Sequence, residues 1–395
     1  MRAPEVVAGP LLETGTGRPA RVAHLTTVDL SLHALLATEL AEDVDAGCDT
    51  WGISAPGEYV PRVEQLGVRH VAIPSFDRSW SLRADVRAAR ELATALRDLQ
   101  PDVLHTHTPK AGVLGRVIGR ALRVPVVVDT CHGLWTRPDQ PRWVRAAVIA
   151  AEGLASRFAH AELYQNAEDR ETMRRFVGDR GAVVGNGVDL TRFDGSGRER
   201  VRAELGVGPD ELLVGGVGRV VREKGIEEYV AAAARLRGRA RFVWVGPADE
   251  AKSDALTTLA LGEDVRFLGI RHDMPSVYAA LDAFVLPSWR EGFSRSGMEA
   301  AASGLPMVLT DIRGCRELGM HGEHLLLVPP RDEEALAAAV GGLLDDAGLR
   351  ERLGSRARER AHQQYDQRMV ARRSLETYVA VARRRGLPWR LEHPA

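Results

Sequence analysis

The chain has 395 residues, more than a single hydrophobic core usually serves, so we expect two domains. Its 53 Lys and Arg residues nearly balance 54 Asp and Glu residues, which leaves no basic surplus of the kind that nucleic-acid-binding proteins carry. The three cysteines are too few and too far apart for a disulfide or zinc framework, which indicates reduced thiols and a cytoplasmic location. No apolar run reaches the roughly 18 residues that a membrane-spanning helix needs, so any membrane contact would be peripheral.

The first half of the chain alternates strand-like and helix-like patterns after a polar stretch. Residues 1–20 contain Gly, Pro and Thr without a long apolar core, so we expect a flexible N-terminal tail there and no signal peptide. The expected strands cover 21–25, 49–54, 69–73, 102–105, 124–129, 161–164 and 182–184, and the expected helices cover 30–45, 82–99, 111–122, 142–158 and 167–176. Such alternation predicts an α/β domain with a parallel, doubly wound sheet over residues 21–190.

Two turn signals, Asn186-Gly187-Val188-Asp189 and Gly195-Ser196-Gly197, mark the expected domain boundary. In the second series the expected strands are 212–217, 241–245, 265–268, 283–286, 306–309 and 325–328, with helices starting near 226, 251, 275, 296 and 333. This series predicts a second sheet domain over residues 191–365, which faces the first across a cleft. An Arg-rich C-terminal helix is expected over residues 366–395.

Two carboxylates lie around a predicted helix start in the second domain. Glu291 follows an apolar run that predicts a buried strand, and Glu299 lies in a short helix expected from Ser296 to Ser303. Glu291 would therefore lie outside the carboxyl end of a strand, which is where ligands of open α/β sheets bind. Carboxylates accept hydrogen bonds from sugar hydroxyls, and helix N-terminal amides favour an anion. The stretch suits a ligand with both hydroxyls and phosphates, although a random pair of Glu side chains is more often simply exposed.

A second candidate site lies where the first strand of the second domain ends. Gly216 and Gly218 let the backbone approach a phosphate there, and Arg219 and Lys224 add two positive charges. Such a pair can neutralise a nucleoside diphosphate leaving group without a metal ion. A dinucleotide fingerprint is one alternative, but Val221 stands where its third glycine would be. A purely structural turn is the other.

No metal site is expected from the sequence. The Asp43-Val44-Asp45 motif ends the first predicted helix, so we expect its carboxylates to be solvated. His105 and His107 flank Thr106 in an extended segment. Because side chains alternate between the two faces of a strand, we expect these two imidazoles not to share a metal ion.

Several short motifs follow one another along residues 21–380. In the first half they are His105-Thr106-His107-Thr108-Pro109-Lys110-Ala111-Gly112, Thr130-Cys131-His132-Gly133 and Asn186-Gly187-Val188-Asp189. In the second half they are Gly218-Arg219 with Lys224-Gly225, Val265-Arg266-Phe267-Leu268-Gly269, Glu291-Gly292-Phe293 with Glu299-Ala300, and Asp311-Ile312-Arg313-Gly314-Cys315-Arg316-Glu317. Each motif alone is weak, but the ordered set resembles the family-4 retaining glycosyltransferases.

This resemblance implies a GT-B fold, in which two Rossmann-like domains face each other across a cleft and the C-terminal helix packs back on the first domain. It implies that the second domain binds a nucleoside diphosphate sugar, with a UDP-sugar as the favoured donor, and that no cofactor is needed. The implied catalytic residues are Arg219 and Lys224, which would hold the diphosphate, and Glu291, which would hold donor-sugar hydroxyls. The implied donor-binding residues are Gly218, Arg271, Phe293, Ser294, Arg295, Ser296, Glu299 and His132.

Within this set the resemblance assigns Glu299 to the ribose, Arg271 to the base and His132 to the donor sugar. It also implies transfer with retention, in which the leaving phosphate helps to deprotonate the acceptor hydroxyl. The loop that begins at Thr26 replaces a Gly-Gly turn of the family, which weakens any detailed transfer of contacts in the first domain. Asp29 and Lys110 are candidates for the acceptor side, with local capping of the following helix as the alternative for Asp29.

A membrane contact is open to two interpretations. Residues 134–138 and 142–149 combine Trp135 and Trp143 with Arg residues and an apolar helix, as interfacial helices do. The same pattern is typical of a helix packed on its own sheet with Arg outward, which is the commoner case. In the first interpretation the protein would bind the inner face of the cell membrane peripherally.

The sequence thus predicts a metal-independent, retaining glycosyltransferase. It would move a hexosyl or N-acetylhexosaminyl group from a nucleoside diphosphate sugar to a hydroxyl of a glycan or polyprenol-linked acceptor, in cell-surface polysaccharide or glycoconjugate synthesis. Two alternatives remain at this stage. One is a nucleotide-sugar epimerase of the same fold, and the other is a non-catalytic nucleotide-sugar-binding protein.

Overall fold

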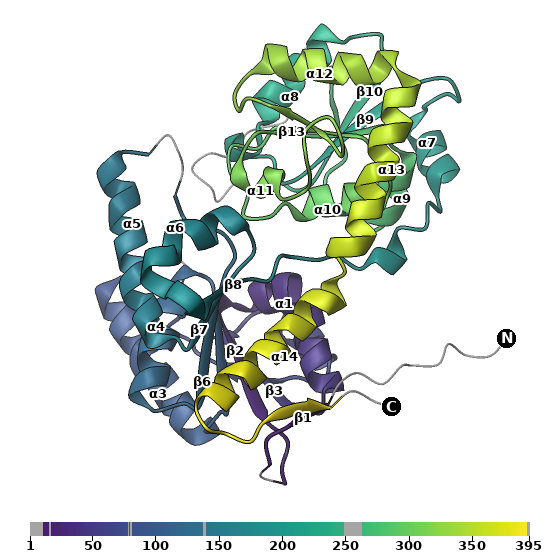
Figure 1. Ribbon diagram of the computed structural model, residues 1–395. Coiled ribbons are helices and arrows are strands. Elements are labelled where there is room, and N and C mark those ends of the chain that lie inside the picture. The colour runs from purple at the N-terminus through teal and green to yellow at the C-terminus, as the bar shows by residue number, and fades with distance from the viewer. Residues whose placement is uncertain are drawn as a thin grey trace, which may run out of the picture. The chain divides into compact units, whose positions relative to one another are not determined.

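The computed structural model describes residues 11–392 except for 16, 78, 80, 137–139 and 249–262. The chain divides into two compact units, residues 1–184 with 367–395, and residues 185–366. Each unit has a parallel sheet with helices packed around it (Figure 1). The first boundary falls slightly before the expected residue 190, because the Val188 amide donates to the Tyr365 carbonyl at 2.8 Å and ties this turn to the second unit.

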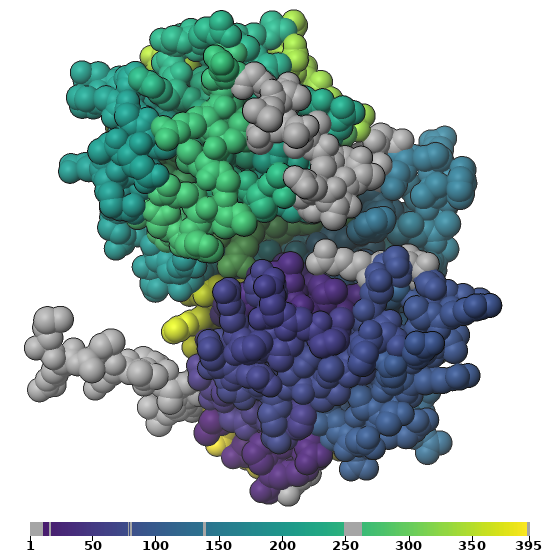
Figure 2. Space-filling view, turned by 180° about the vertical axis from the view of Figure 1, so that it is seen from behind, coloured from purple at the N-terminus to yellow at the C-terminus, as the bar shows by residue number. Residues whose placement is uncertain are grey.

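The described part of the first unit contains a seven-stranded parallel sheet in the order β4-β3-β2-β5-β6-β7-β8. Its strands are β2 (Arg21–Val28), β3 (Asp49–Ala55), β4 (Arg69–Ala72), β5 (Val103–His107), β6 (Val126–Cys131), β7 (Ala161–Tyr164) and β8 (Gly181–Val183). The helices are α1 (Asp29–Asp45), α2 (Val60–Glu64), α3 (Leu82–Leu99), α4 (Pro109–Ala121), α5 (Arg142–Ala155), α6 (Ala167–Val177) and α14 (Gln367–Arg384). On the face shown in Figure 2, this unit presents mainly its purple-to-blue segments, from α1 to α4.

The C-terminal helix α14 belongs to the core of the first unit. Its Leu375 and Tyr378 are fully buried and pack with Val22 of β2, Val103 of β5 and Val126 of β6. The helix lies against α1 on the same side of the sheet (Figure 1). The last segment of the chain therefore covers apolar strand residues that the N-terminal half cannot bury by itself.

The expected flexible tail over residues 1–20 was wrong for its described part. Leu11–Glu13 forms β1, which pairs antiparallel with β15 (Arg390–Glu392). Leu12 is buried against Trp389 and the core around it. A three-residue strand is too short to show a periodic pattern, and its partner comes from the opposite end of the chain. Residues 1–10 lie outside the described part.

The described part of the second unit contains a six-stranded parallel sheet in the order β11-β10-β9-β12-β13-β14. Its strands are β9 (Leu213–Val217), β10 (Arg241–Val245), β11 (Arg266–Phe267), β12 (Ala283–Leu286), β13 (Met307–Thr310) and β14 (Leu326–Val328). Its helices are α7 (Arg198–Leu205), α8 (Ile226–Arg235), α9 (Met274–Ala280), α10 (Arg295–Ala302), α11 (Arg313–Arg316), α12 (Glu333–Asp345) and α13 (Ala347–Gln364). The helix expected from residue 251 lies outside the described residues.

The alternation of strands and helices predicted from the sequence is confirmed in both units. In each sheet the next two strands of the chain are added on one side of the first parallel strand, and the strand after them pairs with its other side. This switch lies between β2 and β5 in the first unit and between β9 and β12 in the second. Ligands of doubly wound sheets bind outside the carboxyl ends of strands at such a point. The loops after these four strands are therefore the first places to look for a site.

Candidate active site

Lys224 and Glu291 meet at the switch point of the second unit. Lys224 ends a short 3-10 turn, Arg222–Lys224, in the segment after β9, and Glu291 lies in the loop after β12. The Lys224 Nζ atom lies 2.5 Å from Glu291 Oε1, and the two side chains are only 19% and 11% exposed. Lys224 and Glu291, which are 67 residues apart in the sequence, thus join the loops of two adjacent strands by an ion pair.

The Glu291 carboxylate is fixed by further contacts. The Ser288 hydroxyl donates to Glu291 Oε1 at 2.7 Å, and the Thr310 hydroxyl at the end of β13 donates to the Ser288 carbonyl at 2.5 Å. A Cβ atom on Gly314 would lie 2.4 Å from the Glu291 carbonyl oxygen, so only glycine lets α11 approach this closely. Sequence reasoning assigned no role to these three positions. Ser288 and Thr310 could have been noted as polar residues at the ends of two buried strands.

Glycines also bring together the backbone around Gly218 and Lys224. Gly225 has a φ of +70°, and a Cβ there would lie 2.0 Å from the Pro287 carbonyl oxygen. The Gly218 carbonyl accepts a hydrogen bond from Trp244 Nε1 at 2.8 Å, and a Cβ on Gly246 would lie 2.0 Å from it. Arg219 lies half-buried in the same loop. The segment after β9 is therefore packed closely against the loops after both neighbouring strands.

The helix α10 starts beside this loop. The Ser294 hydroxyl caps it by accepting from the Gly297 amide at 3.2 Å, and lies 3.3 Å from the Ser296 hydroxyl. Glu299 accepts from the Tyr278 hydroxyl at 3.0 Å and from Arg295 Nε at 3.3 Å. The Arg295 side chain, which the resemblance assigned to the donor, runs along the helix beside Glu299 and is about half exposed. The capped N-terminus and the carboxylate thus lie in one short helix, as the sequence predicted.

Two residues of the predicted donor set have other contacts in this structure. The Phe293 ring is buried and packs edge-on against Tyr365, so only its backbone can meet a ligand. The Arg271 guanidinium is paired with Asp273 at 2.9 Å and with Glu204. Hydrogen bonds from Arg271 and Arg200 hold the pKa of Asp273 below its usual range. The bonds that the structure shows for Arg271 thus go to these two carboxylates and not to the Lys224–Glu291 loops.

The two residues proposed for the acceptor side make structural contacts in the first unit. The Asp29 carboxylate is buried at the start of α1 and accepts from the Tyr59 amide at 2.7 Å. It therefore holds the N-terminus of α2, not of its own helix. Lys110 is 3% exposed, donates to Asp85 at 2.6 Å and also donates to the Ser79 carbonyl.

His132 follows β6 in the first unit and joins a row of imidazoles. Its Nε2 lies 3.1 Å from His107 Nδ1, and its Nδ1 lies 2.9 Å from Gln165 Nε2. His107 Nε2 in turn lies 3.1 Å from His24 Nδ1, and His24 Nε2 lies 2.7 Å from Asp43 Oδ2. Burial lowers the pKa of His132 to about 4.

The solvated position expected for Asp43 was wrong. Helix α1 packs against β2, and the Asp43 carboxylate is completely buried.

The separation expected between His105 and His107 was also wrong. Residues two apart in a strand point to the same face, and their ring centroids lie 4.1 Å apart. Together with His24 and Glu39 they bring four potential ligand atoms within 4.8 Å of one another. Both nitrogens of His105 are nevertheless bonded, to Tyr378 at 2.6 Å and Thr130 at 2.7 Å. Each ring nitrogen of the three histidines has a protein partner, so a metal ion would have to displace existing hydrogen bonds.

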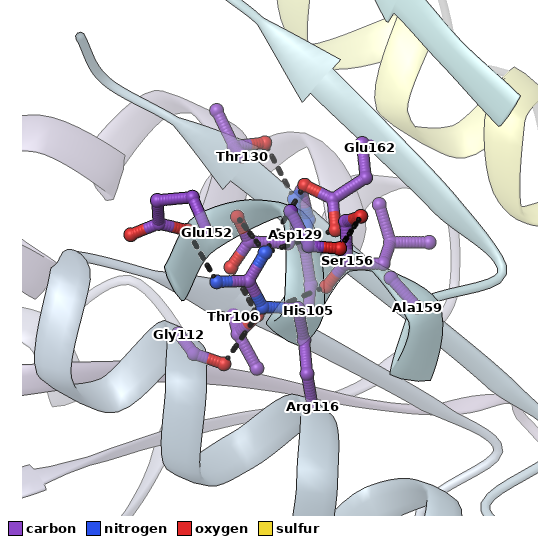
Figure 3. A network of polar contacts seen from close by, with 12 residues as sticks. His105, Thr106, Gly112, Arg116, Asp129, Thr130, Glu152, Ser156, Ala159 and Glu162 are labelled. Carbon is purple, nitrogen blue, oxygen red and sulfur yellow. Dashed lines mark hydrogen bonds and ion pairs between the residues drawn. The ribbon is translucent and has the colours of Figure 1, made fainter. Parts of the chain in front are cut away.

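A buried arginine on α4 lies at the centre of a second polar network (Figure 3). Arg116 donates to Glu162 at 2.9 Å and to Glu152 at 2.7 Å, and lies 3.6 Å from Asp129. Three carboxylates surround one guanidinium. Burial, assisted by the neighbouring carboxylates and opposed by Arg116, raises the pKa of Glu162 to about 8 and that of Asp129 to about 6. Sequence reasoning missed this network, whose one signal is an acidic residue inside each of two apolar strand runs.

Comparisons with known proteins decide the family. Residues 14–187 match the model of the glycosyl transferase 4-like domain, and residues 211–346 match that of the glycosyl transferases group 1. A glycogen synthase from Mycobacterium tuberculosis is 32% identical over 316 residues, which cover 76% of this chain and 74% of that protein. The chain belongs to the family-4 glycosyltransferases.

Other relatives of this glycosyltransferase are named for lipid-linked substrates. The N,N'-diacetylbacillosaminyl-diphospho-undecaprenol α-1,3-N-acetylgalactosaminyltransferase of Campylobacter jejuni is 27% identical over 336 residues, which cover 82% of this chain and 89% of that enzyme. The UDP-Gal:α-D-GlcNAc-diphosphoundecaprenol α-1,3-galactosyltransferase of Escherichia coli is 29% identical over 299 residues, 71% and 76% of the two chains.

The fold of the glycosyltransferase is shared with solved GT-B structures. Anabaena Alr3699/HepE in complex with UDP-glucose has a TM-score of 0.76 at 22% identity, and the match covers 91% of this chain and 99% of that one. A glycosyltransferase from Rickettsia africae ESF-5 has a TM-score of 0.76 at 17% identity, with 92% and 98% covered. The predicted fold class is confirmed. Among the described helices, none combines the length and apolar character needed to cross a bilayer.

Proposed function

We propose that this glycosyltransferase moves a sugar from a nucleoside diphosphate sugar to a hydroxyl of a glycan or polyprenol-linked acceptor, with retention and without a metal ion. Its role would lie in the synthesis of cell-surface polysaccharides or glycoconjugates. The relatives from Campylobacter jejuni and Escherichia coli, whose names specify undecaprenol-linked substrates, support this acceptor class. The structure of the Anabaena relative with UDP-glucose supports a UDP-sugar donor. The observation that carries the proposal is the Lys224–Glu291 pair at the switch point of the second sheet.

Lys224 and Arg219 are proposed to neutralise the diphosphate. Both lie in the segment after β9, which the glycines at 218, 225 and 246 let pack closely against the loops of the two neighbouring strands. In this structure the ammonium of Lys224 has Glu291 as its partner, and charge development on a leaving phosphate would strengthen its interaction with that phosphate. Two cations can supply the positive charge that a divalent metal supplies in other transferases.

Glu291 is proposed to orient the donor sugar. The bonds from Lys224 and Ser288 both reach Oε1, so Oε2 can accept from a sugar hydroxyl. Because Lys224 and Ser288 both donate to it, Glu291 is held as a hydrogen-bond acceptor, which suits sugar positioning better than a glycosidase-like role. Retention by attack from the leaving-group side requires no enzymatic nucleophile, and a fixed Glu291 suits a positioning role in that scheme.

The test is a screen of nucleoside diphosphate sugars with the purified enzyme. Nucleotide release would be measured with and without a polyprenol diphosphate-linked acceptor, and with and without a chelator. We expect release that depends on the acceptor, is unchanged by chelator and yields the same anomeric configuration in donor and product. Loss of activity with chelator would contradict metal independence, and an inverted anomer would contradict retention. Release of a free 2-epimer without transfer would favour the epimerase.

A peripheral membrane contact through α5 is the second part of the proposal. Trp143 is 74% exposed and Trp135 is 63% exposed, and Arg142 and Arg145 are exposed on the same helix as Trp143. Exposed indole rings beside cationic side chains suit an anionic lipid surface. Binding to anionic vesicles should fall in Trp143→Ser and persist in Leu82→Ser, a matched change on α3 whose leucine is 83% exposed. Equal binding by both variants would contradict the contact.

A further inference from the structure

A continuous row of hydrogen bonds runs from the interior of the first unit to His132. It starts at Asp43 on α1, passes through His24 on β2 and His107 on β5, and ends at His132 and Gln165 after β6 and β7. The successive distances are 2.7, 3.1, 3.1 and 2.9 Å. Asp43, His24 and His107 are completely buried, and each link of the row is a direct contact between side chains.

With Asp43 ionised, the donors and acceptors of the row allow one arrangement in which all three imidazole rings are neutral. An ionised Asp43 can only accept, so His24 carries hydrogen on Nε2 and presents a bare Nδ1 to His107. His107 then donates from Nε2, and His132 donates from Nε2 to the bare Nδ1 of His107. The remaining nitrogen, Nδ1 of His132, accepts from the side-chain amide of Gln165.

The row also has a protonated arrangement. If a proton reaches Nδ1 of His132, that ring can pass its Nε2 hydrogen to His107, and His107 can pass its own Nε2 hydrogen to His24. One proton has then entered, and His24 is an imidazolium beside the Asp43 carboxylate. His107 and His132 remain neutral but now carry hydrogen on Nδ1. Gln165 must turn its amide so that the oxygen accepts from His132.

We propose that Asp43, His24 and His107 form a proton relay to His132, in which protonation of His24 decides which ring nitrogen of His132 carries hydrogen. The relay lies within the first unit and goes beyond the proposed function. In one state Nδ1 of His132 accepts from the Gln165 amide, and in the other it is an N–H donor. Asp43, His24 and His107 act through His132 and are therefore positioning residues.

The charges around the row favour the imidazolium at His24, the ring beside Asp43. Burial opposes a charged His24, but the hydrogen bond and charge of Asp43, with Glu39, outweigh it and raise the pKa of His24. Burial and the neighbouring imidazoles lower the pKa of His107 well below its usual value. The titratable groups that surround His24 and Asp43 are Glu39 of α1, Cys48, His105 and His107 of β5, and Tyr378 of α14.

Nitrogen NMR of ¹⁵N-histidine-labelled full-length protein tests the relay without substrate. Between pH 9 and pH 5 we expect the hydrogen of His132 and His107 to move from Nε2 to Nδ1 while both rings stay neutral and His24 becomes cationic. A tautomer of His132 that stays constant while His24 titrates would overturn the proposal. So would a cationic His132, or purified protein that holds one equivalent of a metal ion among these histidines.

Two variants and one control separate the relay from a merely structural role. His24→Gln should abolish the change of tautomer at His132, and Asp43→Asn should move it to lower pH, because the carboxylate that stabilises the imidazolium is gone. His105→Gln is the control, since His105 is equally buried on the same sheet face but outside the row, and it should leave the change intact. An unchanged His132 response in both relay variants would refute the proposal even if the enzyme proves to be a transferase. A normal response in an enzyme without transferase activity would refute only the proposed function.

Discussion

The Lys224 ammonium and the Glu291 carboxylate lie 2.5 Å apart, although they follow different strands of the second sheet. Their side chains are mostly shielded from water, and Ser288 donates to the same carboxylate oxygen. The pair therefore fixes the relative positions of the two loops that we propose hold the diphosphate and the donor sugar.

Lys224→Ala should reduce turnover far more than donor affinity. The ammonium is proposed to act on charge that develops as the phosphate leaves, so its loss should lower kcat by about 100- to 1,000-fold while donor Kd changes by only a few fold. Steady-state kinetics and direct titration with the donor would measure the two effects. An equal loss in both would mean that Lys224 contributes only ground-state binding.

Glu299→Gln should show the opposite pattern. Tyr278 can still donate to the amide oxygen, so α10 should keep its place, but the charged acceptor for ribose hydroxyls is lost. We expect donor KM to rise by about 10- to 100-fold with kcat nearly unchanged, because a ribose contact is made equally in the ground and transition states. A fall in kcat at unchanged KM would place Glu299 in the chemical step.

Gly314→Ala should impair activity through the Glu291 loop. The added methyl group would lie 2.4 Å from the Glu291 carbonyl oxygen, so the loop must shift and the carboxylate with it. We expect at least a tenfold loss of kcat/KM in a folded protein, since a displacement of about 1 Å near the chemistry can cost up to about a hundredfold. Gly342→Ala on α12 is the control, because nothing lies within 4 Å of the new atom and activity should be unaffected. Wild-type kinetics for both variants would refute the tight fit.

The Arg116 network should make the protein less stable as the pH rises. Burial raises the pKa of Glu162 to about 8, so the folded state holds a proton that the unfolded chain releases near the ordinary value of 4.5. The folded protein therefore binds more protons than the unfolded protein in this window, and the free energy of unfolding should fall between about pH 5 and pH 8. Urea unfolding at several pH values would measure the slope. Glu162→Gln should flatten it, and an identical slope in that variant would assign the pH dependence to other groups.

Much of the fold and part of the site could be predicted from the sequence. Strands and helices alternate with clear periodicity, and short motifs such as Gly218-Arg219 and the Glu291 stretch lie immediately after buried strands, where the topology of a parallel sheet gathers ligand-binding loops. Functional residues in such loops can therefore be recognised from single short sequence motifs. The Ser288 and Thr310 contacts were missed because a single hydroxyl residue after a strand has no distinguishing spacing.

The amino-acid sequence by itself determined the two parallel-sheet domains and the motifs that show the family, because local periodicity and strand-end position carry that information. Only the tertiary structure decided which polar side chains are buried together. Asp43 lies on a helix, His24 and His107 lie on two strands, and His132 follows a third. Their hydrogen bonds depend on the order and register of these strands. The Lys224–Glu291 pair depends likewise on β9 lying beside β12, which no spacing along the chain reveals.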